Sequence, residues 1–90
     1  MKTYKFKQTA IKIKDTNGKE IIFNGGARHT NAMWLISEQG LFSCYDDWHE
    51  DGFIIEVDGK EEFFNRYQST IIADKLGIKH QGSLISEDIW

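Results

Sequence analysis

The residues most able to do chemistry are concentrated in one stretch, Leu41–Glu62. Residues 46–62 carry eight carboxylates against one lysine, with large aromatic side chains among and beside them. Aromatic rings surrounded by polar groups are typical of protein interfaces. The sequence therefore predicts a partner-binding surface made of Tyr45, Asp46, Asp47, Trp48, Glu50, Asp51, Glu56, Asp58, Glu61 and Glu62. The alternative is a solvated acidic turn, with Trp48 folded back on a sheet.

The same acidic segment partly matches a calcium-binding loop. Positions one, three, five, six and twelve of such a loop would be Asp47, His49, Asp51, Gly52 and Asp58. Histidine is a poor calcium ligand, Asp58 is shorter than the usual bidentate glutamate, and the flanks are predicted as strands rather than helices. We therefore expect no metal ion and no cofactor. A metal-dependent hydrolase that uses His49 with the neighbouring aspartates is an alternative function.

A glycine-rich segment, Asn24–Asn31, follows a predicted strand. Its backbone N–H groups and Arg28 could hold a phosphate group, and His29 could supply a proton. The segment lacks the Walker and dinucleotide-binding spacings, and two adjacent glycines are also typical of a simple bend. A small-ligand or nucleotide-binding module that uses Gly25, Gly26, Arg28 and His29 is a further alternative function.

The single cysteine, Cys44, could act as a nucleophile only with a histidine beside it. The three histidines, His29, His49 and His80, are in separate segments, and Cys44 is in a short apolar run that predicts a buried strand. We therefore predict no catalytic residues and a protein that is not an enzyme. One cysteine also excludes an internal disulfide bond, which fits a reducing compartment.

The elements that must position these residues begin with a long N-terminal strand. Tyr4 and Phe6 follow one alternation, whereas Ile11 and Ile13 follow the other. A shift of one residue exchanges the two faces of a strand. The sequence therefore predicts a bulge or bend near Thr9–Ile11.

The segment Asp15–Gly18 predicts a β-hairpin. A two-residue Asn-Gly turn would place Lys14 opposite Ile21. A three-residue Thr-Asn-Gly loop, with its glycine left-handed, would instead place Ile13 opposite Ile21 and Lys14 opposite Glu20. We prefer the three-residue loop because it pairs apolar residues with each other and lysine with glutamate.

The middle of the chain predicts three more strands. The apolar runs Ala32–Ser37 and Leu41–Tyr45 are predicted as strands joined by a glycine turn, although the first also fits a helical turn and a half. An acidic break follows at Asp46–Gly52. The next apolar run, Phe53–Val57, predicts another strand.

A helix is predicted over residues 60–76. Asp58 would cap it, Glu61 would complete a capping box, and Gly77 would end it. The last residues are predicted as a short strand or helical turn, docked by the final Ile-Trp pair. Large aromatic residues are assigned to the core: Phe6, Phe23, Trp34, Phe63, Phe64 and Tyr67.

Charge is divided along the chain, whose net charge is −3. Residues 1–20 hold six lysines and two acids, whereas residues 38–62 hold nine acids and one lysine. Either the basic strand pairs with the acidic segment inside the fold, or an acidic face stays open and repels nucleic acid. We therefore predict no direct binding to nucleic acid.

The 90 residues, 40% hydrophobic and 28% charged, predict a single soluble domain over residues 1–90. No apolar run is long enough to cross a bilayer, and the N-terminus lacks the apolar core of a signal peptide. We therefore expect no membrane partner and a cytoplasmic location. A homodimer formed through an exposed strand edge stays open.

Together these elements predict an α+β fold: an antiparallel sheet of four or five strands packed against one helix at about residues 60–76. The acidic aromatic surface predicts a non-enzymatic module that binds a basic protein. Carboxylates on a rigid surface can imitate phosphates, so the partner would be a nuclease or another protein that handles nucleic acid. In its size, acidity and mixture of aromatic and acidic residues, the chain resembles small inhibitors encoded by phages and mobile elements, including anti-CRISPR proteins, and immunity proteins that neutralise toxins. The resemblance implies an inhibitor that acts in the cytoplasm of a host cell.

Overall fold

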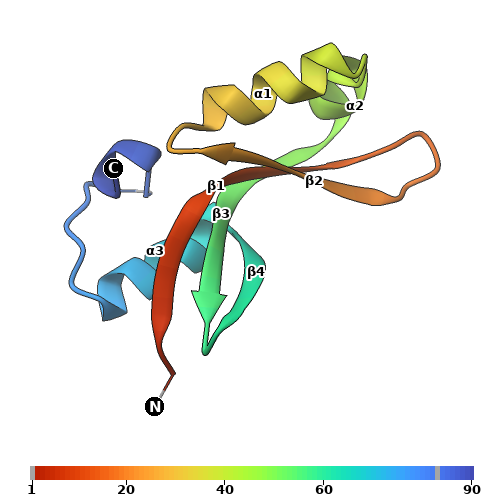
Figure 1. Cartoon of the computed structure of the whole chain (residues 1–90). Coiled ribbons are helices and arrows are strands. Elements are labelled where there is room, and N and C mark those ends of the chain that lie inside the picture. Colours follow the sequence, from red (N-terminus) through yellow and green to blue (C-terminus); the bar gives the residue numbers. More distant parts are fainter. Residues whose placement is uncertain (1, 83) are drawn as a thin grey trace.

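The computed structural model describes residues 2–82 and 84–90. Its centre is a four-stranded antiparallel sheet in the order β2-β1-β3-β4 (Figure 1). The strands are β1 (Tyr4–Lys14), β2 (Glu20–Gly26), β3 (His49–Val57) and β4 (Lys60–Asn65). The helices are α1 (His29–Glu38), α2 (Phe42–Asp47), α3 (Arg66–Lys75) and the short 3-10 turn η1 (Ser86–Asp88). The α+β class and the four antiparallel strands confirm the prediction; within this part of the chain, no helix has the length and apolarity needed to cross a bilayer.

The β1–β2 hairpin forms in the predicted three-residue register. Gly18 has a φ of +80°, which only glycine adopts without strain. The Asp15 N–H group donates to the Lys19 carbonyl at 2.9 Å and closes the loop. Ile13 therefore lies opposite Ile21, and both point into the core side of the sheet.

The predicted break in alternation is a bulge in β1. Against β2, the register shifts between Thr9 and Ala10, within the predicted stretch, whereas against β3 it shifts between Phe6 and Gln8, earlier in the chain than predicted. Phe6 lies opposite Ile55, and beyond the bulge Ile11 lies opposite Asp51. Ile55 and Asp51 share a face because side chains alternate along β3. The extra residue therefore keeps both apolar groups of β1 on one face of the sheet.

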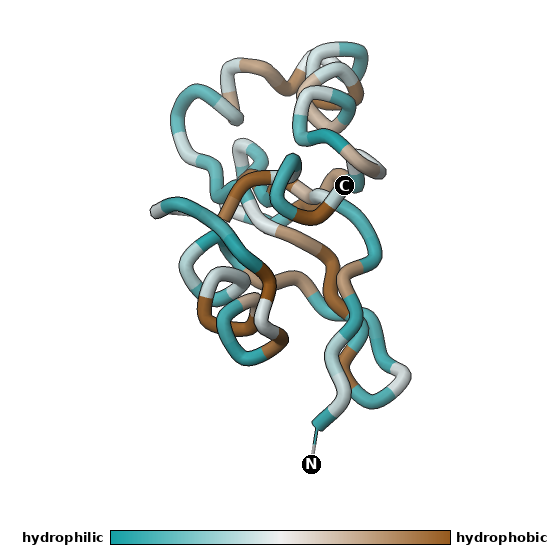
Figure 2. The backbone as a smooth tube through the Cα atoms, turned by 90° about the vertical axis from the view of Figure 1, so that its left-hand side faces the viewer, coloured by the Kyte–Doolittle hydropathy of each residue, from teal (hydrophilic) through white to brown (hydrophobic). Residues whose placement is uncertain are grey.

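Helices cover this face in two portions. The first hydrophobic cluster, under α1 and α2, contains Ile11, Ile13, Phe23, Ala32 and Ile36. The second, under α3 and the C-terminal segment, contains Phe53, Ile55, Ile72, Ala73 and Leu84. Because a sheet of long strands twists, the two portions face different directions, and Figure 1 shows α1 and α2 near one end of the sheet and α3 near the other. Figure 2 shows the hydrophobic positions along the middle of the sheet and on the helices, with hydrophilic positions in the connections.

The two apolar runs predicted as strands are helical, so these predictions are wrong. Ala32 and Ile36, one helical turn apart, are fully buried against the sheet. Leu41–Tyr45 lies almost entirely in α2, and its Cys44 packs on the same cluster. Short apolar runs fit a buried strand or a buried helix equally well, and here burial at four-residue spacing requires a helix.

Both predicted breaks are also shorter than expected. The elements β2 and α1 include all of Asn24–Asn31 except Ala27 and Arg28. The elements α2 and β3 include all of Asp46–Gly52 except Trp48. Residues 46–52 are therefore not a loop, because regular elements fix the directions of all of their side chains except that of Trp48.

The predicted helix of the C-terminal half is present as α3, and it begins later than predicted. Residues 60–65, predicted as its first turns, instead form β4 and pair with β3. Asp58, the predicted cap, lies in the β3–β4 turn with a φ of +51°. Asn65 caps the helix instead. Gly77 follows the helix end with a φ of +74°, as predicted.

Three of the six aromatic residues assigned to the core belong to the two hydrophobic clusters. Phe23 is buried, and Phe6 and Phe64 are half-buried against the second cluster. Phe63 is also half-buried, but it lies opposite Ile54, outside both clusters, with the Lys12 ammonium group 4.7 Å from its ring centroid. Trp34 and Tyr67 are instead 69% and 75% exposed, on the outer sides of α1 and α3. The assignment of these two residues to the core is therefore wrong, because each lies on the face of its helix that turns away from the sheet.

Candidate functional site

The predicted partner-binding residues do not form one surface. Two acids end α2 and four surround the β3–β4 turn: Asp46 and Asp47 in the first group, and Glu56, Asp58, Glu61 and Glu62 in the second. The strand β3, which separates the groups, has nine residues, so its ends are roughly 27 Å apart. A single small partner segment cannot contact both groups at once.

Glu50 and Asp51, between the two groups, contact other residues of the fold. The Asn65 Nδ2 group donates to Glu50 Oε2 at 3.3 Å, and Arg66 Nη2 lies 3.5 Å from Asp51 Oδ2. Asp51 Oδ1 and Arg66 Nε are buried without a hydrogen-bond partner among the described residues, so this ion pair contributes little stability. Lys12 lies opposite Glu50, so the basic strand runs beside the acidic strand, as one of the two alternatives predicted. These two carboxylates belong to the junction between β3 and α3.

The side chains of α2 and the start of β3 form an aromatic row of Phe42, Tyr45 and His49, in which Tyr45 and His49 are stacked and Phe42 is tilted by 34° to Tyr45. The Phe42 and Tyr45 ring centroids are 5.5 Å apart, and the Tyr45 and His49 centroids are 3.9 Å apart with nearly parallel planes. A hydrogen bond of 2.8 Å joins His49 Nδ1 to the Tyr45 carbonyl oxygen. Phe42 is 51% exposed and His49 is also exposed, so the row presents ring surface to solvent.

Tyr45 anchors this aromatic row in the fold. Its ring packs against the first hydrophobic cluster. Burial raises the pKa of its hydroxyl group, and the negative charge of Asp51 raises that pKa further. Tyr45 therefore stays neutral near pH 7 and acts as a rigid support for the two more exposed rings.

Asp46 and Asp47 lie beside the aromatic row and are both exposed. They occupy the C-terminal end of α2, where the partial negative charge of the helix dipole disfavours carboxylates. Within residues 2–82 and 84–90, neither forms an ion pair. The stability of the fold therefore does not explain the presence of two acids at this position.

Trp48 is separated from the aromatic row. It is half-buried, and the ammonium group of Lys14 lies 4.5 Å from its ring centroid. This cation–π contact connects the end of α2 to the end of β1. Trp48 thus packs against a strand of the sheet, which agrees better with the alternative of a folded-back side chain than with an exposed interface residue.

The glycine-rich segment is occupied by contacts within the fold. A Cβ atom at Gly25 would lie only 2.7 Å from the Arg28 carbonyl oxygen, so α1 packs directly on this backbone. Arg28 donates from Nη1 to the Ala27 carbonyl at 2.8 Å and from Nη2 to the Trp90 carbonyl at 3.3 Å. Gly26 ends β2 with a positive φ. Ligand binding by this segment stays a prediction.

His29 has an internal role as well. Its Nε2 atom is 2.7 Å from the Gly52 carbonyl oxygen, and its ring meets the Phe53 ring edge-on with centroids 5.1 Å apart. Burial lowers the pKa of His29 below the ordinary value of 6.5, although its bond to Gly52 opposes this shift. The neutral imidazole therefore fits its position at the start of α1, where it links α1 to β3.

The residues with calcium-loop spacing do not form a loop that could surround an ion. Asp47 ends a helix, and His49 and Asp51 lie in an extended strand, whereas a calcium loop must curl around its ion. Among the described residues, no three His, Cys, Asp or Glu side chains are grouped so that they could hold a metal ion. Cys44 lies on α2 against the first cluster, and its pairing with a histidine stays untested.

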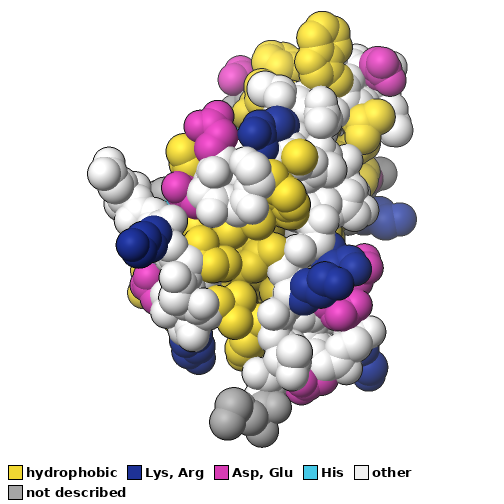
Figure 3. Space-filling view, turned by 60° about the vertical axis from the view of Figure 1, so that its left-hand side comes forward, with side chains coloured by type: hydrophobic (Ala, Val, Ile, Leu, Met, Phe, Trp, Pro, Cys, Tyr) yellow, Lys and Arg dark blue, Asp and Glu magenta, His cyan; other side chains and the backbone are white. Residues whose placement is uncertain are grey.

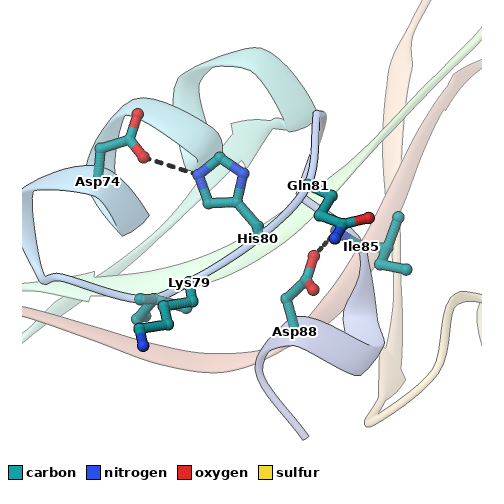
Figure 4. A pocket seen from close by; sticks show the side chains of 7 residues that line it. Asp74, Lys79, His80, Gln81, Ile85 and Asp88 are labelled. Atoms are coloured by element: carbon teal, nitrogen blue, oxygen red, sulfur yellow. Dashed lines mark hydrogen bonds and ion pairs between the residues drawn. The ribbon is translucent and has the colours of Figure 1, made fainter.

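A broad hollow of about 810 Å³ lies away from all these residues, between the end of α3 and the C-terminal segment. Figure 4 shows Asp74 and His80 pointing toward one another at one side of it, with Asp88 and Ile85 at the other side. His80 Nε2 is 2.7 Å from Asp74 Oδ1. Asp74 and His80 therefore bind each other, and Asp88 Oδ2 accepts from the Ile85 N–H group at 2.9 Å, while Lys79 and Gln81 also line the hollow.

The geometry defines the class of this protein as a small α+β domain that exposes aromatic rings beside two carboxylates for which the described residues supply no ion pair. The chain matches no protein-family model, and no curated protein or solved structure matches it. The function is therefore inferred from the surface itself.

Proposed function

We propose that the chain is a non-enzymatic protein-binding module that docks on a basic partner through the α2 surface. This surface consists of the aromatic row (Phe42, Tyr45 and His49) with Asp46 and Asp47. The observation that carries the proposal is the position of two unpaired carboxylates at the unfavourable end of α2, directly beside stacked and exposed rings.

The chemistry of this surface fits an arginine-rich or lysine-rich partner. A guanidinium group stacks on aromatic faces and pairs with carboxylates through its planar N–H groups. The α2 surface offers both kinds of contact within one short helix and the first residue of the next strand. Because Tyr45 and His49 are already stacked, little freedom of these two side chains would be lost when a partner binds.

A basic protein that handles nucleic acid is the partner we propose, and inhibition is the consequence. Such a protein presents cations that normally meet phosphates, and carboxylates on a rigid surface compete for them. The second acidic group, at the β3–β4 turn, would increase the rate of encounter by long-range attraction. A cytoplasmic location, in a host cell if the protein is phage-encoded, belongs to the same proposal.

Affinity capture from a cell lysate at low and high salt tests this proposal. The baits are the native chain, an Asp46→Asn/Asp47→Asn variant and a control variant, Glu61→Gln/Glu62→Gln. The control variant also loses two negative charges, but it loses them near the other end of β3. We expect the native chain and the control to retain the same basic protein at low salt. The Asp46→Asn/Asp47→Asn variant should retain at least tenfold less, and high salt should release the partner because it screens exposed charges.

Stability measurements separate lost binding from lost folding. Removing two carboxylates from the C-terminal end of α2 should leave the free energy of unfolding unchanged or raise it by about 0.3–1 kcal/mol for each. A variant that binds worse while unfolding at the same or higher urea concentration supports a binding role for these acids. Recovery of the same proteins by the native chain and the Asp46→Asn/Asp47→Asn variant would refute the proposal.

A further inference from the structure

An apolar groove lies between α3 and the end of the sheet where β1 begins. It has a volume of about 310 Å³ and is lined by Lys2, Tyr4, Val57, Glu62, Phe64, Gln68, Ile71 and Ile72. Beside Tyr4 it continues into a second hollow of about 470 Å³, lined by Lys2, Tyr4, Lys75 and Leu76. The groove is at the opposite end of β3 from the α2 surface, so it is independent of the proposed function.

The groove leaves hydrophobic side chains uncovered. Ile71 and Leu76 are 42% and 43% exposed, and Tyr4, Val57 and Phe64 are half-buried. Figure 3 shows a strip of hydrophobic side chains that runs through the middle of one face of the molecule, between polar and charged margins. Contiguous exposed apolar surface is typical of binding sites, whereas single exposed hydrophobic residues scattered over a surface are common and need no explanation.

The charges of the groove are arranged at two separate sides. Lys2 and Lys75 border the second hollow, and no carboxylate lines it. In the described part of the chain, neither lysine forms an ion pair. Glu62 lies on β4, which is two strands away from β1, so the two strands are roughly 10 Å apart across the sheet. An anionic group is therefore favoured at the lysine side and disfavoured at the Glu62 side.

We propose that this groove binds a medium-chain aliphatic carboxylate, a free fatty acid. Its chain lies on Val57, Phe64 and Ile71, and its carboxylate lies between the ammonium groups of Lys2 and Lys75. The aliphatic chain occupies only the groove, whose volume of about 310 Å³ is at the lower end of the range for small-molecule sites, which favours a medium chain over a long one. The opposite charges of the two sides determine the orientation of the bound ligand, with its carboxylate at the lysine side.

An NMR titration of the ¹⁵N-labelled chain with decanoate, below its micelle concentration, tests the proposal. We expect saturable shifts of amide signals from α3 and from the first residues of β1. Decan-1-ol, which keeps the chain and lacks the charge, should bind several-fold more weakly, and decylammonium should bind more weakly still. Equal shifts with all three amphiphiles, or no saturable shift with decanoate, would overturn the proposal.

Matched variants locate the site. Ile71→Glu should weaken decanoate binding at least tenfold, whereas Leu35→Glu, at a similarly exposed position on α1, should leave it unchanged. Lys2→Glu/Lys75→Glu should weaken it to a similar extent, whereas Lys19→Glu/Lys79→Glu should not. If Ile71→Glu instead abolishes a concentration-dependent self-association of the ligand-free chain, the groove is covered by a second copy and the fatty-acid proposal is wrong.

Discussion

His80 fixes the C-terminal segment to α3 through two acceptors. Its Nε2 atom is 2.7 Å from Asp74 Oδ1, and its Nδ1 atom is 2.8 Å from the Gly82 carbonyl oxygen. A neutral imidazole can donate only one hydrogen bond, whereas the imidazolium form donates two. The bond to Asp74 accordingly raises the pKa of His80 above its ordinary value of 6.5, with smaller effects in the same direction from Gly82 and the nearby Asp88.

The raised pKa of His80 predicts a pH-dependent stability. A pKa that is higher in the folded state stabilises the fold fully below about pH 6.5, and this stabilisation disappears as the pH rises through the folded-state pKa. His29, whose pKa is lowered, acts with the opposite sign. The difference in unfolding free energy between the native chain and His80→Gln should therefore be larger at about pH 5.5 than at about pH 8.5, as measured by urea unfolding.

A direct titration checks the cause of this pH dependence. In an NMR pH titration, the His80 ring signals of the native chain should titrate above pH 6.5, and Asp74→Asn should move the midpoint downward. The His29 signals serve as the internal control in the same spectra, because His29 contacts Gly52 and Phe53 rather than Asp74. An unchanged His80 midpoint in Asp74→Asn would show that the Asp74 contact does not form in solution.

At the scale of single elements, α3 begins with a capping box formed by Asn65 and Gln68. The Gln68 N–H group donates to Asn65 Oδ1 at 2.8 Å, and the Asn65 N–H group donates to Gln68 Oε1 at 3.0 Å. Asp58, which the sequence analysis assigned to this role, instead accepts from the Thr3 N–H group at 2.8 Å. It thereby links the β3–β4 turn to the first residues of the chain.

The two capping assignments predict different mutational effects. Asn65→Ala should lower the free energy of unfolding by about 1 kcal/mol, because it leaves N–H groups at the start of α3 without a partner. Asp58→Asn should change it by less than about 0.5 kcal/mol, because asparagine tolerates a positive φ and can still accept from Thr3. Urea unfolding followed by circular dichroism measures both values. A larger loss in Asp58→Asn than in Asn65→Ala would contradict the assignment of the helix cap to Asn65.

At the scale of the whole molecule, the C-terminal segment closes the second hydrophobic cluster. Leu84 is fully buried in that cluster, and its N–H group donates to Thr70 Oγ1 at 3.1 Å. The Trp90 ring stacks on Phe53 with centroids 6.3 Å apart. The carbonyl oxygen of Trp90 accepts a hydrogen bond from Arg28, so the end of the chain also contacts the start of α1. These contacts connect the two covered portions of the sheet.

Removal of residues 84–90 should therefore destabilise the whole domain. Loss of a buried leucine side chain alone costs about 2–5 kcal/mol, which is a large part of the stability of a small domain. We expect the shortened chain to lose cooperative urea unfolding and the dispersion of its NMR signals. Trp34→Ser, which removes a larger but exposed side chain, is the control and should change the unfolding free energy by less than about 0.5 kcal/mol. Retention of the native unfolding midpoint after the deletion would contradict this role.

Local features of the sequence were sufficient for the parts of the fold that depend on neighbouring residues. The Thr-Asn-Gly loop and the alternation on each side of it predict the hairpin register, because turn geometry and the two-residue period of a strand act within a few positions. The change of alternation predicts the bulge in β1, and Gly77 predicts the end of α3. The α+β class follows from the same patterns.

The candidate site could be predicted only in part. Tyr45, Asp46 and Asp47 were identified from the mixture of acidic and aromatic residues. Phe42 was missed because its three-residue spacing from Tyr45 has meaning only on a helix, and this run was predicted as a strand. The separation of the acids into two groups was likewise not visible, since it depends on the length and direction of β3.

The tertiary structure alone decided which of two local possibilities each ambiguous segment adopts. Residues 60–65 fit the first turns of a helix and a strand equally well, and they form β4 because they pair with β3, for example Phe63 with Ile54. Ala32–Ser37 is helical because Ala32 and Ile36 both bury against β1 and β2. The sequence by itself therefore determined turns, alternation and fold class, whereas non-local pairing and burial decided these segments and, with them, the surface that we propose binds the partner.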